Sequence, residues 1–125
     1  MIFLLDISTL VALIFKNHTH HDIARKWMAG KTLAVCPLSE LGFLRVAVSP
    51  AHNATIEEAR TALKDFCQVE KTAFLPADIS ALAGKAAPSA SKSTDWYLAN
   101  LAEHHGMKWA TLDTKANHPA RSLVA

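Results

Sequence analysis

The sequence predicts a three-layer α/β domain with a mainly parallel central sheet of four to five strands. Short apolar runs alternate along the chain with longer segments whose apolar residues recur at helical spacing. This alternation is typical of a parallel sheet covered by helices on both faces. The first run, Ile2 to Leu5, contains no polar residue, as expected for a central strand. A chain of 125 residues suits one domain, so we expect residues 1–125 to form a single unit.

The segment after Asp6 is predicted to be a helix, because apolar residues recur at helical spacing from Leu10 to Ile14. We expect Ser8 or Thr9 to be its N-cap, and the alternative is that Asp6 itself caps the helix. In either case, Asp6 lies at the turn between the first strand and the first helix.

A polar connection from Lys16 to His21 leads to a second predicted helix, from about Asp22 to Ala29, which Gly30 should end. The connection contains three of the seven histidines: His18, His20 and His21. They could form a zinc site, but a solvated loop before a helix start accounts for the same residues and is favoured.

Thr32 to Cys36 is apolar enough for a second strand, and Pro37 suits the first position of a helix that Ser49-Pro50 ends. Glu40 then falls in or near the first turn of this helix, beside the end of a strand. Its plain structural explanation is a favourable charge at a helix N-terminus.

Thr55 to Glu58 has the T-x-x-E form of a capping box and should open a helix that continues through Phe66. Lys71 to Leu75 is a candidate third strand. Asp78 to Leu82 is predicted to be a short helix, with Asp78 as a cap.

The last third of the chain is predicted to contain a helix, a tight turn and a buried strand. Thr94 should be the N-cap of the helix, and Asp95 lies in its first turn, where an anion suits the helix dipole. Lys108 to Leu112 is the predicted strand, and Asp113 follows it, where ligands bind in open parallel sheets. Asn117 to Ala125 can add a short edge strand.

The formal net charge of +2 is too small to indicate nucleic-acid binding by bulk electrostatics, because the thirteen basic residues form no block. Any RNA must therefore be held by local contacts. Cys36 and Cys67 match no metal-ligand spacing, so we expect free thiols in a reducing compartment. The apolar amino terminus lacks a basic leader and is too short to span a membrane, so a soluble cytoplasmic protein is the default expectation.

Four carboxylates occupy equivalent places, each just after a strand or at the start of a helix beside one: Asp6, Glu40, Asp95 and Asp113. In a parallel sheet these places converge on one edge. Four anions brought together would raise one another's pKa values and destabilise the fold, so such a cluster implies bound cations. Oxygen ligands favour Mg²⁺ or Mn²⁺, which can activate water and neutralise charge on a phosphodiester.

Other chemistries have little support in the sequence. It contains no G-x-S-x-G elbow, no phosphate-binding P-loop and no dinucleotide-binding G-x-G-x-x-G. A haloacid-dehalogenase-like phosphatase would need a second aspartate two residues after Asp6, where this chain has Ser8.

Three segments carry a resemblance to a known family: LLDISTLVAL, CPLSELGFLRV and STDWYLANLAEHHGMKWATLDT. They resemble the signature blocks of PIN-domain proteins, in particular the VapC-type toxins of toxin–antitoxin modules. The resemblance implies a PIN-like fold and a Mg²⁺- or Mn²⁺-dependent endoribonuclease whose acidic residues match Asp6, Glu40, Asp95 and Asp113. Many relatives carry a further acid shortly after the last of these, where this chain has Lys115 and Asn117.

The resemblance also implies an RNA substrate, a homodimer and a cognate VapB-like antitoxin that occludes the acidic pocket. Supporting roles are expected for Ser8 or Thr111, which can assist the attacking water or orient a carboxylate. Candidates for contacts with RNA phosphates flank the acidic blocks: Arg45, Lys92 and Lys115.

The leading hypothesis is therefore a metal-dependent endoribonuclease that acts as the toxin of a type II module. The alternative is a PIN-like RNA- or protein-binding module that keeps its carboxylates but cleaves weakly or not at all. The missing acid beyond Asp113 motivates this alternative.

Overall fold

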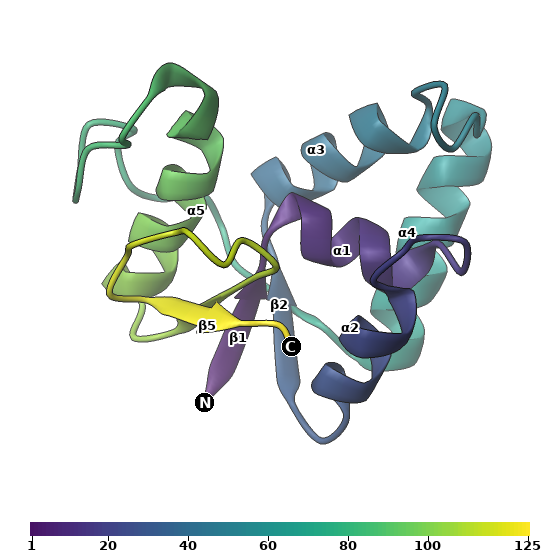
Figure 1. Ribbon diagram of the computed structural model, residues 1–125, viewed down its shortest axis with the longest axis horizontal. Helices are drawn as coiled ribbons and strands as arrows, with labels where there is room; N and C mark the ends of the chain where they lie inside the picture. Colours follow the sequence, from purple (N-terminus) through teal and green to yellow (C-terminus); the bar gives the residue numbers. More distant parts are fainter.

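The computed structural model describes all 125 residues and contains a five-stranded parallel sheet between two layers of helices (Figure 1). The strands are β1 (Ile2–Leu5), β2 (Thr32–Val35), β3 (Ala73–Phe74), β4 (Lys108–Thr111) and β5 (Arg121–Leu123). Their order in the sheet is β3-β2-β1-β4-β5, and every neighbouring pair is parallel. The predicted α/β class and its mainly parallel sheet are confirmed.

Five α-helices and one 3-10 turn connect the strands. They are α1 (Ile7–Ile14), α2 (His21–Met28), α3 (Pro37–Ala47), α4 (Ile56–Glu70), the turn η1 (Ala90–Lys92) and α5 (Ser93–His104). In Figure 1, α1, α3 and α4 lie on one side of the strands and α5 lies on the other, and their buried residues belong to two separate cores. Each face of the sheet is thus covered by helices.

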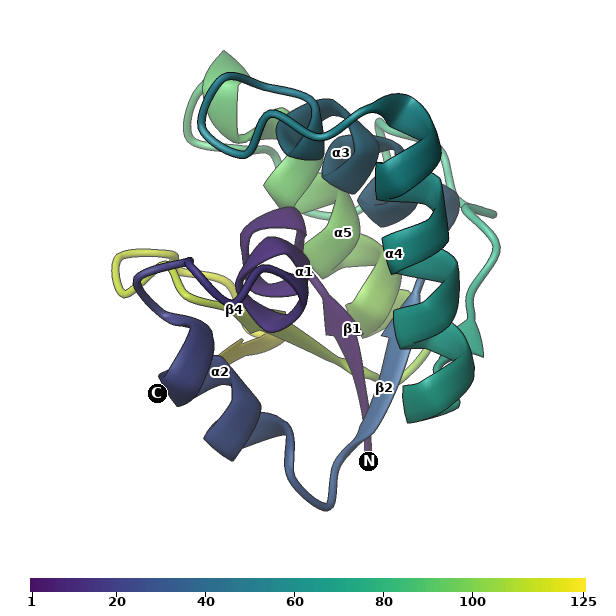
Figure 2. The same cartoon turned by 90° about the vertical axis from the view of Figure 1, so that its right-hand side faces the viewer.

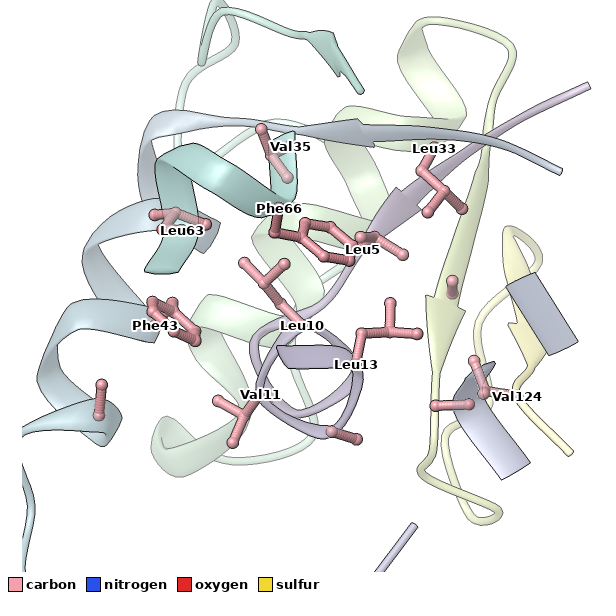
Figure 3. Packing of buried hydrophobic residues seen from close by; sticks show 14 of the residues in the cluster. Leu5, Leu10, Val11, Leu13, Leu33, Val35, Phe43, Leu63, Phe66 and Val124 are labelled. Atoms are coloured by element: carbon pink, nitrogen blue, oxygen red, sulfur yellow. The ribbon is translucent and has the colours of Figure 1, made fainter. Parts of the chain in front are cut away.

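Side chains alternate between two apolar cores because successive residues of a strand point to opposite faces of the sheet. Leu5 packs with Leu10, Leu13 and Phe66 in the core beneath α1 to α4 (Figure 3). Its neighbour Leu4 points to the other face, into a core that contains both Trp96 of α5 and Trp109 of β4. Burial on both faces explains why β1 contains no polar residue.

Two favoured N-cap predictions are wrong, and for α1 the alternative, a cap by Asp6 itself, is confirmed. The cap of α1 is Asp6, whose Oδ1 accepts a hydrogen bond from the Thr9 backbone N–H at 2.8 Å, and neither Ser8 nor Thr9 has this position. Thr94 is not the cap of α5, because α5 begins at Ser93 and Thr94 lies inside its first turn. The chain enters α5 directly from η1, so Thr94 never takes the extended conformation that an N-cap needs.

The predicted short helix at Asp78–Leu82 is also wrong, since this segment consists of bends and turns. Leu82 is 94% exposed, so the segment buries too little apolar surface to stabilise a single helical turn. The Asp78 carboxylate does not cap a helix, and instead its Oδ1 lies 2.7 Å from Nε2 of His105.

Several local predictions are confirmed. Thr55 and Glu58 form the expected capping box, Pro37 opens α3, and the tail adds the edge strand β5. Cys36 and Cys67 are free cysteines. None of the helices combines the length and the apolar character needed to cross a lipid bilayer.

Candidate functional site

Asp6 stands at the carboxyl end of the central strand, and the surrounding backbone holds it firmly. Its N–H donates to the Ala110 carbonyl at 3.0 Å, which fixes it beside β4. Its Oδ1 accepts hydrogen bonds from Ser8 Oγ at 2.9 Å and from the Thr9 N–H at 2.8 Å. These two bonds leave the second carboxylate oxygen free of the cap, so Asp6 can cap α1 and still present an oxygen to a ligand.

Burial raises the pKa of Asp6, because the side chain is only 2% exposed. Hydrogen bonds from Thr111, the Thr9 backbone and Ser8 act in the opposite direction and favour the carboxylate. Of the two residues that the sequence predicts as supporting, Ser8 donates to the Asp6 carboxylate, and Thr111 lowers the pKa of Asp6. Their geometry suits orientation of that carboxylate.

Asp113 lies in a turn just beyond β4, as expected. Its N–H donates to Thr111 Oγ1 at 3.0 Å, its Oδ1 accepts from the Lys115 N–H at 2.9 Å, and Lys92 Nζ lies 3.2 Å from its Oδ2. The Lys115 N–H and the Lys92 ammonium lower the pKa of Asp113. Asp113 is therefore held in its charged form.

Asp95 joins the other two aspartates into one group. It lies in the first turn of α5, and its pKa is raised by burial first and then by the negative charges of Asp6 and Asp113, while Lys92 opposes the rise. Ser8, which donates a hydrogen bond to Asp6, lines the same hollow as Asp95, so these acids lie on the same side of the molecule. We refer to Asp6, Asp95 and Asp113 as the acidic triad.

Glu40 is not brought together with the acidic triad. It is half-buried in the first turn of α3, and its side chain lines a hollow of about 780 Å³ between α3 and α4, with Arg60 and Cys67. Burial raises the pKa of Glu40, and no charge of the triad contributes. On α3, Ser39 and Gly42 are the residues buried inside the molecule, whereas Glu40 is half-buried beside residues of α4.

The three candidate RNA contacts differ in their environment. Lys92 bridges to Asp113, with its side chain 42% exposed. Arg45 is exposed on α3 and lines a second hollow, of about 410 Å³, together with Asp95 and Ser8. Lys115 contacts the site only through its backbone, and its side chain is exposed. Arg45 and Lys92 thus lie nearest to the triad.

Carboxylate oxygens are the donors that Mg²⁺ and Mn²⁺ prefer, and the triad carries more negative charge than Lys92 alone can balance. In donor type and charge, the triad suits a divalent cation. No three acidic, histidine or cysteine side chains stand close enough together to hold one ion as they are. A bound ion would have to draw the carboxylates closer.

Two histidines lie unexpectedly close to the triad. His18 and His52 line the same 410 Å³ hollow as Asp95, although they come from the loops after α1 and α3. The sequence marks His18 as part of a histidine-rich loop, but it contains no signal for His52 or for their proximity to Asp95.

Comparisons with known proteins agree on one family. The model of the PIN domain matches residues 3–122. Ribonuclease VapC38 of Mycobacterium tuberculosis is 37% identical over 119 residues, which cover 88% of this chain and 84% of the relative. Ribonuclease VapC29 of the same species is 34% identical over 122 residues, with 94% and 90% coverage.

A solved structure shows the same fold. It is VapBC2 from Rickettsia felis bound to a DNA fragment from their promoter, and its matching chain has a TM-score of 0.65 at 15% identity, with 98% of this chain and 97% of that chain covered. The family model and the identity to two relatives confirm the family resemblance seen in the sequence. The chain belongs to the PIN domain family, in the group of the VapC ribonucleases.

Proposed function

We propose that this chain is an endoribonuclease that hydrolyses RNA phosphodiester bonds and acts as the toxin of a VapBC-type module. Its similarity to proteins named as VapC ribonucleases supports the reaction class. The observation that carries the proposal is the placement of the acidic triad: Asp6 and Asp113 follow the neighbouring parallel strands β1 and β4. Asp95 lines the same hollow as Ser8, which donates a hydrogen bond to the Asp6 carboxylate. Such a group is suited to hold a cation beside a phosphate.

The acidic triad would bind Mg²⁺ or Mn²⁺ through its carboxylate oxygens. When bound, such an ion activates water and neutralises the charge that builds up on the phosphate during hydrolysis. Glu40 enters this ligand set from its position in the sequence, beside the end of a strand, and from the family resemblance. It would have to leave its place between α3 and α4 to reach the ion.

The chain's own residues would set the geometry of the reaction. Thr111 acts on two members of the triad, because it lowers the pKa of Asp6 and its Oγ1 accepts a hydrogen bond from the Asp113 N–H. Ser8 holds the Asp6 Oδ1 atom on the other side. Lys92 and Arg45 supply positive charge for the RNA phosphates on either side of the cleaved bond.

We propose that a VapB-like antitoxin covers the acidic triad, and the name of the solved structure with this fold, a VapBC assembly, supports this partner. We also propose a homodimer, which rests on the family resemblance alone. A basic side chain of the antitoxin would pair with the uncompensated charge on Asp95. Two free cysteines favour a reducing compartment, and we propose the cytoplasm.

The test is cleavage of purified RNA by the isolated chain. Wild-type protein should cut RNA with Mg²⁺ or Mn²⁺ and stop when the metal is removed with EDTA. Asp95→Asn should be inactive, while the control Glu57→Gln, which changes an exposed acid in the first turn of α4, should remain active. Equal cleavage by wild type and Asp95→Asn from identical preparations would contradict the proposal.

The alternative is a PIN-like binding module with weak or no nuclease activity. Two observations favour it: Lys115 and Asn117 stand where many relatives carry a further acid, and no three acidic side chains are close enough to share an ion as they are. Stabilisation by Mn²⁺ without cleavage of any RNA would support this second candidate.

A further inference from the structure

The hollow of about 410 Å³ beside the acidic triad combines three kinds of side chain. Asp95 belongs to the acidic triad, and Ser8 donates a hydrogen bond to Asp6. Arg45 comes from α3, and the two histidines, His18 and His52, come from two separate loops. Figure 2 shows the helices that bring these residues together, with α3 beside α1 and the start of α5. The volume lies within the range of pockets that bind small organic ligands, about 300 to 1,000 Å³.

The rings of His18 and His52 continue a row of rings that starts in the apolar core. Phe15 stacks on the fully buried Phe43 with centroids 5.7 Å apart, and His52 stacks on Phe15 at 4.3 Å. His18 follows with its centroid 6.4 Å from that of His52 and its plane only 7° from parallel. The two imidazoles are therefore parallel flat surfaces anchored to the core and partly exposed at the hollow.

A hydrogen bond orients the His18 ring, and its surroundings favour the neutral form. Its Nδ1 accepts a hydrogen bond from the His20 N–H at 3.0 Å, so the proton of the neutral ring lies on Nε2. Burial lowers the pKa of His18, and the charges of His20, His52 and His21 lower it further. The ring thus offers a neutral face and an N–H donor. His52 adds a buried Nδ1 atom that has no hydrogen-bond partner in the protein.

We infer that His18 and His52 form a nucleobase subsite, in which one base of the RNA stacks on these rings while Arg45 contacts the backbone phosphate. The choice of RNA rests on the proposed function. Stacking on flat rings beside basic groups is how proteins hold single-stranded nucleic acid, and it tolerates every base. The chain needs such a local contact because its basic residues form no block and its net charge is only +2.

Binding of mononucleotides tests the subsite without any cleavage. The metal-free full chain is titrated with each nucleoside 5′-monophosphate and with ribose 5-phosphate, and the histidine Hε1 signals are followed by NMR. At least one nucleotide should shift the His18 and His52 signals by its ring current, and ribose 5-phosphate should not. Absence of any shift, or equal shifts with ribose 5-phosphate, would overturn the inference.

Variants separate stacking from other roles of His18. His18→Ala should weaken nucleotide binding about fivefold or more, the loss expected when one base loses its stacking partner. His18→Phe keeps a flat ring and should bind nearly as well as wild type. The matched control is His104→Ala, which changes an exposed histidine at the far end of α5, about 14 Å along the helix from Asp95.

Cleavage kinetics distinguish failure of the subsite from failure of the proposed function. In an active enzyme, His18→Ala should raise KM about fivefold or more with a smaller change in kcat, and His18→Phe should restore KM. Active wild type with an unchanged KM in His18→Ala would overturn the subsite and leave the ribonuclease intact. Wild type that cuts no RNA would contradict the proposed function, and the nucleotide titration would still decide the subsite.

Discussion

Lys92 Nζ lies 3.2 Å from Asp113 Oδ2, so the residue just before α5 is paired with the residue just after β4. The pair joins the element that carries Asp95 to the turn that carries Asp113. Its ammonium group also counteracts part of the negative charge around Asp95. Lys92 therefore acts as an internal cation at the place where we propose that a metal binds.

Replacing Lys92 with methionine should strengthen metal binding. The substitution removes a positive charge that competes with the ion for Asp113, so we expect the Kd for Mn²⁺ to fall about two- to fivefold, in keeping with a solvent-screened pair. Isothermal titration calorimetry measures this change. Lys85→Met is the matched control, because Lys85 pairs with Glu103 away from the triad. Weaker Mn²⁺ binding by Lys92→Met would contradict the claim that Lys92 and the metal ion compete for Asp113.

Two substitutions of Asp6 should separate its capping role from its charge. Asparagine can still accept the Thr9 N–H, so Asp6→Asn should keep the stability of the fold and lose RNA cleavage. Alanine cannot, so Asp6→Ala should lower the free energy of unfolding by about 1 kcal/mol relative to Asp6→Asn. Urea unfolding of both variants gives the difference. If the alanine variant is as stable as the asparagine variant, the cap does not contribute as described.

The charge on Asp95 should destabilise the metal-free fold at neutral pH. Its pKa is raised in the native state, so between its ordinary value of 3.8 and the raised value the native state binds more protons than the unfolded state. Stability linked to this group therefore falls as the pH rises through that interval, and the loss is complete above the raised pKa.

Asp95→Asn removes this loss. We expect the variant to be more stable than wild type at about pH 7 without metal, by about 1 kcal/mol or less because the group is partly solvated, and the difference should vanish near pH 3.8 or below. Urea unfolding at several pH values tests this. The same variant should also lose the stabilisation that Mn²⁺ gives to wild type. If Asp95→Asn is less stable than wild type at neutral pH, the charged Asp95 carboxylate does not destabilise the metal-free fold as described.

Glu40→Gln should affect metal binding less than Asp95→Asn does. Glu40 lines the hollow between α3 and α4, and no charge of the triad acts on it. We expect Mn²⁺ still to raise the Tm of Glu40→Gln, and not that of Asp95→Asn. Glu57→Gln, in the same hollow, is the control. Equal loss of the Mn²⁺ effect in Glu40→Gln and Asp95→Asn would show that Glu40 joins the metal site.

Much of the architecture could be predicted because apolar periodicity reports burial directly. The run at Ile2 to Leu5 has no polar residue because both faces of β1 are covered. Since the run ends at Leu5, the sequence could also place Asp6 at the carboxyl end of this strand. The family resemblance is confirmed by the comparisons, and with it the kind of protein to which these acids belong.

What escaped prediction depends on geometry that spacing does not contain. The cap of α5 differs because η1 leads into this helix, and for α1 the sequence left the choice between Asp6, Ser8 and Thr9 open, which the bond from the Thr9 N–H to Asp6 decides. Glu40 has the expected position along the chain, but it lines a hollow with Arg60 and Cys67 of α4. The closeness of His18 and His52 depends on two loops that are far apart in the sequence. Each of these features is set by tertiary packing.

The most direct test of the account is a crystal of the chain soaked in Mn²⁺ and measured at the manganese absorption edge. We predict an anomalous peak bound by oxygens of Asp6, Asp95 and Asp113, with Lys92 displaced from Asp113. Peaks only at other places, or none in a fully soaked crystal, would contradict the claim that these three aspartates form one metal site.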